Sequence, residues 1–156
     1  MLSNIDLEKM AQRYRLSNFA VVSKDQLTTK INPCNLILNL ENEYDEKGEL
    51  NDGSHWVALF VDHDYNCFYF DSFGFPPANC VLKYMRKSKK RITYNSRVIQ
   101  NINSSICGLY CLTLLVWMNR KRGEQTSLNR FEEFIDRFSD DVEQNGKILK
   151  EILSQF

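Results

Sequence analysis

The chain has 156 residues, and its 20 Lys and Arg side chains balance its 20 Asp and Glu side chains. This length suits one domain with a hydrophobic core of its own, so we expect residues 1–156 to form a single domain. Its 43% hydrophobic and 26% charged residues are typical of a globular, water-soluble protein. The balanced charge predicts no global attraction to nucleic acid, and no apolar run approaches the roughly 20 residues that a membrane-spanning helix needs.

Cysteine usage argues against a secreted protein and against a metal site. The five cysteines are irregularly spaced: Cys34, Cys67, Cys80, Cys107 and Cys111. Asp6, Glu8 and Lys9 interrupt the apolar residues of the N-terminus, so we expect no secretory signal and an intracellular protein. With no CxxC pair and only two histidines, the sequence predicts no metal. Most of these cysteines are expected to be small buried hydrophobes.

The first third of the chain predicts one helix, one ambiguous segment and one loop. Residues 4–14 carry apolar side chains at helical spacing, and Ser3 with Asp6 resembles a capping box. Residues 34–40 follow an Asn-Pro turn signal and fit either a helix or a strand. Residues 41–54 are polar, acidic and hold two glycines, which indicates an exposed loop.

The middle of the chain predicts a hairpin. Two apolar segments, 55–61 and 67–70, are joined by the turn 62–66, and two prolines shortly after the second segment end the ladder. Phe73 and Phe75, in the turn that follows, are expected to be core aromatics. Residues 92–99 are a further strand candidate.

Helices dominate the last third. Residues 107–118 are the most apolar stretch and predict a buried helix, which the cations and glycine at 120–123 would end. Amphipathic patterns predict two more helices near 127–138 and 141–154. A helix, then strands, then helices predict the α+β class, with a central sheet flanked by helices.

Four residues together predict nucleophilic catalysis by a thiol. His55 opens one hairpin strand and Asp71 ends the other, so an antiparallel pairing brings the imidazole beside the carboxylate. Cys107 begins the buried helix, whose positive end stabilises a thiolate. Gln100 precedes the cysteine by seven residues and could donate, with the Cys107 backbone N–H, to an oxyanion. A thiol peptidase needs this set of groups.

Each residue by itself also has a plainer interpretation. His55 alone fits a structural histidine, and Asp71 alone fits a turn carboxylate. Gly108 leaves room for a substrate backbone to approach the sulfur. Trp56 fits a core residue or one that lines a substrate cleft. The set of motif residues, rather than any single member, favours catalysis.

Three segments resemble the adenovirus-type endopeptidase (adenain), whose clan includes the SUMO-specific proteases. They are residues 54–56 (Ser-His-Trp), residues 70–75 (Phe-Asp-Ser-Phe-Gly-Phe) and residues 100–111, where Gln, Asn-Ser and Cys-Gly match in place. The Gln-to-Cys spacing of the SUMO proteases is one residue shorter, which favours the viral branch. Asp71 stands where many adenovirus enzymes carry Glu, a change that keeps the carboxylate.

The resemblance implies a papain-like α+β fold and a thiol protease with the triad order His55, Asp71, Cys107. It implies viral maturation: capsid processing by cleavage of structural precursor proteins after small Gly-containing sequences, in the virion and the infected host cell. We expect a monomer that needs no cofactor beyond a peptide or DNA activator. No cysteine matches the one that forms the activating disulfide in adenovirus enzymes.

Two alternative functions stay open, as does DNA as a binding partner. The same core chemistry suits a protease that removes ubiquitin-like modifiers, and the same fold suits a catalytically silent binding module. Residues 83–91 carry six basic side chains, which indicate a solvated face or a DNA contact through Lys87, Lys89 and Lys90.

Overall fold

The computed structural model describes residues 1–42, 44–49, 55–120 and 125–156. Parts of the predicted loop at 41–54 and of the predicted helix-ending signal at 120–123 lie outside these ranges. In the described residues the elements are, in chain order, α1 (Asn4–Arg13), β1 (Phe19–Ser23), η1 (Lys24–Gln26), β2 (Cys34–Asn39), β3 (Trp56–Val61), β4 (Cys67–Phe70), α2 (Asn79–Arg86), β5 (Ile92–Tyr94), α3 (Cys107–Asn119), α4 (Ser127–Asp136), η2 (Val142–Gln144) and α5 (Asn145–Leu153).

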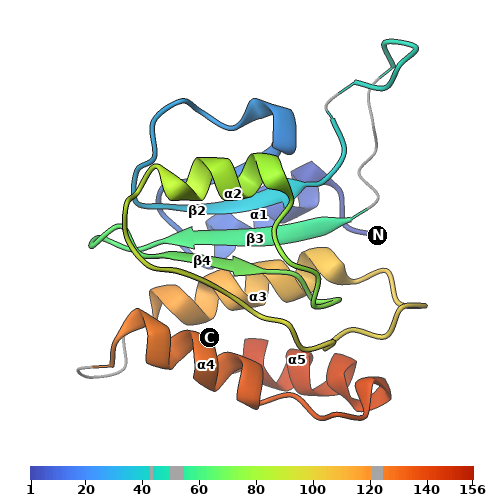
Figure 1. Ribbon diagram of the computed structural model, residues 1–156. Coiled ribbons are helices and arrows are strands. Elements are labelled where there is room, and N and C mark those ends of the chain that lie inside the picture. The colour runs from blue at the N-terminus through green and yellow to red at the C-terminus, as the bar shows by residue number, and fades with distance from the viewer. Residues whose placement is uncertain (43, 50–54, 121–124) are drawn as a thin grey trace.

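The strands form one sheet in the spatial order β1-β2-β3-β4-β5. Its middle strands β2, β3 and β4 are labelled in Figure 1. β3 is antiparallel to β2 and to β4, whereas β1 runs parallel to β2 and β5 runs parallel to β4. The sheet is therefore mixed, and the predicted α+β fold class is confirmed.

Helices cover both faces of the sheet, so its central strand is buried at every position. Successive residues of a strand point to opposite faces. Trp56 and every second residue after it in β3 face a larger core that also includes α1, α3, α4 and α5. Val57 and every second residue after it face a smaller core closed by α2. β3 therefore places its first residues deep in the molecule.

Helix α3 lies between the sheet and the pair α4 and α5 (Figure 1). Eleven of its residues are buried, from Cys107 to Met118. A helix that is apolar on all sides needs such cover on all sides. Its position inside the molecule brings its N-terminus to the edge of the sheet where β3 begins.

Most predicted elements are confirmed. The helices expected at 4–14 and 107–118 are α1 and α3, and the predicted hairpin is β3 with β4. The ambiguous segment 34–40 is a strand, β2. The capping box exists: the Ser3 hydroxyl accepts from the Asp6 N–H at 3.2 Å, and the Asp6 carboxylate accepts from the Ser3 N–H at 2.9 Å. The last predicted helix begins later than expected, because a 3-10 turn, η2, precedes α5.

The strand predicted at 92–99 is too long, since β5 ends at Tyr94. Asn95 then pairs through its side chain: its amide oxygen accepts from the Asp71 N–H at 3.1 Å, and its amide nitrogen donates to the Asp71 carbonyl at 2.7 Å. The Asn95 side chain thus replaces the backbone hydrogen bonds that would continue the ladder between β4 and β5. The strand therefore ends at Tyr94. β1 and α2 were not predicted.

None of the helices in the described ranges combines the length and apolar character needed to cross a membrane.

Candidate active site

His55 and Asp71 meet at the edge of the sheet where β3 begins and β4 ends. The imidazole Nε2 lies 2.8 Å from Asp71 Oδ1, and the side chains are 17% and 1% exposed. The antiparallel pairing of β3 with β4 makes residues 16 positions apart in the chain neighbours in space. With Nε2–H donated to the carboxylate, the second ring nitrogen, Nδ1, is free to exchange a proton.

Asp71 is held in place by His55, Phe73 and Asn95. Its Oδ1 also accepts from the backbone N–H of Phe73 at 2.8 Å, and Asn95 holds its backbone on both sides of the residue. The Phe73 ring stacks on the imidazole, with centroids 4.8 Å apart and planes inclined by 24°. Phe73 is therefore half-buried beside His55 rather than in the core, and Phe75 is exposed, so the expected core positions for these two were wrong.

Cys107 is the first residue of α3, and its side chain is 3% exposed. Among the described residues, no side chain caps this helix end, so its backbone N–H groups keep their partial positive charge. Burial raises the pKa of the Cys107 thiol, but His55 lowers it by hydrogen bonding and charge, as do the backbone N–H groups of Trp56 and Gly108. The net pKa lies below that of an ordinary thiol. The site therefore favours a thiolate.

The imidazole shows the complementary shift. Burial lowers the pKa of His55, but the hydrogen bond to Asp71, the hydrogen bond to Cys107 and the charges of both groups raise it to about 9. The second ring nitrogen, Nδ1, is buried. A lowered thiol pKa beside a raised imidazole pKa favours transfer of the thiol proton from Cys107 to His55.

Gln100 is buried, and hydrogen bonds at both ends of its side-chain amide fix the orientation of that amide. Its amide oxygen accepts from the Ser72 hydroxyl at 2.6 Å, and its Nε2 donates to the Ser104 carbonyl at 2.8 Å. The Ser72 carbonyl also accepts the backbone N–H groups of Ile99 and Gln100, both at 2.9 Å. Since an amide nitrogen carries two N–H groups, one remains for a substrate oxygen.

Sequence reasoning missed Ser72 and Asn95 as supports of the site. Ser72 follows Asp71 directly, and its position beside a candidate catalytic residue was a usable signal. Asn95 had no comparable signal, because its contact with Asp71 spans 24 residues.

Trp56 and Gly108 pack against each other beneath the nucleophile. Trp56 is 1% exposed, so its ring lies in the core, while its backbone N–H lowers the Cys107 pKa. A Cβ at Gly108 would lie 3.3 Å from the side chains of both Leu7 and Trp56, which gives a packing reason for glycine. A substrate-binding role for Trp56 and Gly108 stays a prediction.

The predicted DNA-contacting lysines lie away from these groups, at the end of α2 and after it. Lys87 Nζ donates to the Thr29 carbonyl at 2.9 Å and lies 5.7 Å from the Tyr84 ring centroid. Lys89 and Lys90 are exposed. Lys87 thus has a local structural contact, and DNA binding or activation by DNA or a peptide stays a prediction.

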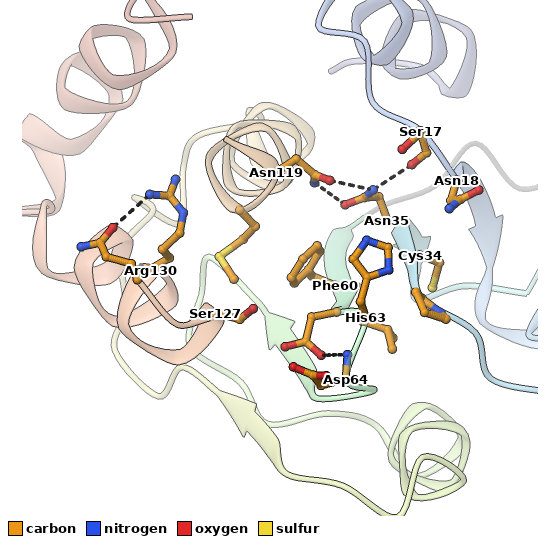
Figure 2. A pocket seen from close by; sticks show the side chains of 15 residues that line it. Ser17, Asn18, Cys34, Asn35, Phe60, His63, Asp64, Asn119, Ser127 and Arg130 are labelled. Atoms are coloured by element: carbon orange, nitrogen blue, oxygen red, sulfur yellow. Dashed lines mark hydrogen bonds between the residues drawn. The ribbon is translucent and has the colours of Figure 1, made fainter. Parts of the chain in front are cut away.

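The second histidine, His63, lines a hollow of about 410 Å³ at the end of β3 opposite His55 (Figure 2). Cys34, His63 and Asp64 contribute to its lining. Burial and the nearby Cys67 raise the pKa of Cys34 to about 11, although a hydrogen bond with Tyr84 opposes them. This thiol is therefore protonated at neutral pH. In the described part of the chain, no group of three or more His, Cys, Asp or Glu side chains could hold a metal ion.

The fold is similar to that of the ASFV pS273R protease. Its crystal structure is 17% identical with a TM-score of 0.55, and the match covers 96% of this chain and 63% of that one. The selenomethionine crystal structure of the same protease is 19% identical with a TM-score of 0.51, covering 89% and 68%. This chain thus spans less than two thirds of the first structure.

At such identity the likeness shows the fold alone, which is that of a viral cysteine protease. No protein-family model matches the chain, and no curated protein matches it in sequence. The adenovirus-type branch within this fold stays a prediction.

Proposed function

We propose that the chain is a cysteine endopeptidase with Cys107 as nucleophile, His55 as general base and acid, and Asp71 as the orienting carboxylate. One observation carries the proposal. The Cys107 thiol, at the N-terminus of α3, interacts with an imidazole whose other nitrogen lies 2.8 Å from a buried carboxylate. This is the arrangement that activates a thiol for attack on a carbonyl carbon.

Acylation begins when the thiol proton moves to His55 Nδ1. The Cys107 thiolate attacks the scissile carbonyl carbon and forms the C–S bond. The resulting oxyanion accepts hydrogen bonds from the free N–H of Gln100 Nε2 and from the Cys107 backbone N–H. The C–N bond then breaks, and the leaving amine takes the proton from His55. The product of this half-reaction is a thioester on Cys107.

Deacylation reverses the roles. His55 removes a proton from a water molecule as its oxygen attacks the thioester carbon, and the same N–H groups hold the second oxyanion. The C–S bond breaks, the carboxylic acid leaves, and the Cys107 thiolate is restored beside the imidazolium. Asp71 keeps Nδ1 facing the sulfur through both halves.

The proposed substrates are viral structural precursor proteins, cleaved after small Gly-containing sequences in the virion or the infected cell by a monomeric enzyme. The motif resemblance at residues 54–56, 70–75 and 100–111 supports this choice, as does the viral origin of the protease whose fold is similar. Incubation with capsid precursors, followed by mass spectrometry of new N-termini, tests it directly.

The chemistry is tested first by the rate of iodoacetamide alkylation across pH. Because Cys80 is exposed and can react as well, modification should be measured on the proteolytic fragment that contains Cys107. Wild type should react fast well below a pH of about 8.5, the range of an ordinary thiol. His55→Ala should lose this fast reaction at neutral pH.

The matched control is His63→Ala, which removes the other histidine and should keep the wild-type profile. A slow, ordinary profile of Cys107 in wild type would contradict the proposed pair. An equal profile in wild type and His55→Ala would show that the helix end alone activates the sulfur, and His55 would lose its assigned role.

A further inference from the structure

An apolar hollow of about 550 Å³ begins at His55. Phe75, Val98 and Ile102 line it and are 64%, 52% and 82% exposed. Eight large hydrophobic side chains are exposed in the described residues, so three of them gather around this one hollow. Exposed apolar side chains that cluster, rather than scatter, mark a place where another molecule binds.

Close backbone contacts hold the walls of the hollow, and one of them also anchors Gln100. One wall is the turn after Asp71, where Gly74 has φ +76° and approaches the backbone of residues 96–97 so closely that a Cβ would lie 2.9 Å from it. The other wall is the segment 98–102, which the Ser72 carbonyl anchors through the backbone N–H groups of Ile99 and Gln100. The hollow is therefore preformed, as ligand pockets usually are.

The position of the hollow relative to the catalytic pair indicates which half of a substrate enters it. The acyl half is bonded to the Cys107 sulfur, whereas the leaving amine must reach His55 to take its proton. The lining includes His55 and Asp71 but not Cys107. The polypeptide that continues from the leaving amine thus passes over the hollow.

We infer that this hollow is a specificity pocket for a large aliphatic or aromatic side chain on the leaving-group side of the scissile bond. The inference rests on the proposed peptidase function and adds a substrate requirement to it. Leu40, Pro76, Ala78 and Phe73 add further apolar lining around the exposed trio. The Phe73 ring also stacks on the His55 imidazole, so the hollow adjoins the general base directly. A glycine or a charged residue at that place in the substrate would leave the apolar lining exposed to water.

The test is cleavage of an unbiased library of proteome-derived peptides, read by sequencing the new N-termini. The first two residues after the cleaved bond should be enriched about tenfold in Leu, Ile, Met, Phe or Tyr over Gly or Ser, since apolar pockets discriminate by this order. Ile102→Lys should abolish the apolar preference and shift it toward Asp and Glu.

The matched control is Ile5→Lys, which changes another exposed isoleucine, 62% exposed, on α1 outside the hollow. This variant should keep the wild-type preference. Cleavage without apolar enrichment, or an unchanged preference in Ile102→Lys, would overturn the inference and leave the proposed peptidase standing. Absence of all cleavage together with an unreactive Cys107 would overturn the peptidase, and the pocket with it.

Discussion

The two ends of β3 hold the same three kinds of side chain in different settings. His55 precedes the strand and meets Asp71 and Cys107, whereas His63 follows the strand beside Asp62, Asp64 and Cys34. The Cys107 pKa is lowered, but burial and Cys67 raise that of Cys34 to about 11 despite a hydrogen bond with Tyr84. Residue types alone therefore do not decide which thiol can attack a substrate.

Two structural differences account for the contrast. Cys107 begins a helix, where backbone N–H groups stabilise a thiolate, while Cys34 begins a strand, which offers no such charge. Asp71 is buried and accepts from an imidazole, whereas Asp62 accepts from the backbone N–H groups of Asp64 and Asn66, at 3.0 and 2.9 Å, and so stabilises its own turn. A helix end and a carboxylate that accepts from an imidazole therefore distinguish the end of β3 at which we propose a reactive thiol.

The largest expected effect compares the two thiols. Cys107→Ala should lower kcat/KM for a cleaved peptide by about 10⁴-fold or more, because no other group can form the thioester. Cys34→Ala should keep kcat/KM within about twofold. Steady-state kinetics with circular dichroism as a folding check measures both. Retained turnover in Cys107→Ala would show that another residue is the nucleophile. Loss of activity in Cys34→Ala would show that the two thiols do not differ as proposed.

The next effect concerns the carboxylates. Asp71→Asn should lower kcat by about 10²- to 10⁴-fold, since a neutral amide no longer stabilises the imidazolium. Burial lowers the His55 pKa, and Asp71 and Cys107 together raise it to about 9, so activity should fall as pH rises through about 9, where the imidazolium loses its proton. In Asp71→Asn this alkaline limb of the kcat/KM profile should move to lower pH.

Asp62→Asn is the matched control for this change. It should leave the alkaline limb in place, because Asp62 bonds to its own turn. The limb belongs to the coupled Cys–His pair rather than to one group, so its displacement is the quantity to compare. An unmoved limb in Asp71→Asn would show that the carboxylate acts only on the fold.

A smaller effect is expected from Ser72, which holds the Gln100 amide. Ser72→Ala should lower kcat about tenfold with little change in KM, because the donor to the oxyanion loses its orientation. When Gln100 is already replaced by Ala, adding Ser72→Ala should lower kcat no further. Additive losses in this double-mutant cycle would show that Ser72 acts on something other than Gln100.

The smallest effect is on stability, measured by urea unfolding. Gly74→Ala should lower the free energy of unfolding by about 2–4 kcal/mol, because a Cβ adds a 2.9 Å approach to the Arg97 backbone to the cost of a positive φ. Gly48→Ala, at φ +78° with nothing within 4 Å, should cost only about 1 kcal/mol. Equal losses would show that the turn after Asp71 has room to relax.

The sequence by itself determined the helices and the hairpin that depend on residues close together in the chain. Apolar spacing predicted α1, and two apolar segments around a turn predicted the hairpin, which was enough to bring His55 beside Asp71 at a shared sheet edge. The length and apolarity of 107–118 were enough to predict a buried helix that begins at Cys107. These features are set by residues close in the chain, so short patterns carry them.

Only the tertiary structure decided the contacts between distant segments. The Asn95 pairing that ends β5, the Ser72 hydroxyl on Gln100 and the Phe73 ring on His55 each depend on where whole segments pack. The same holds for the hollow between the turn after Asp71 and residues 98–102, and for the exposed position of Phe75. Burial and hydrogen-bond partners set the pKa of a thiol, and both are properties of the folded chain rather than of a motif.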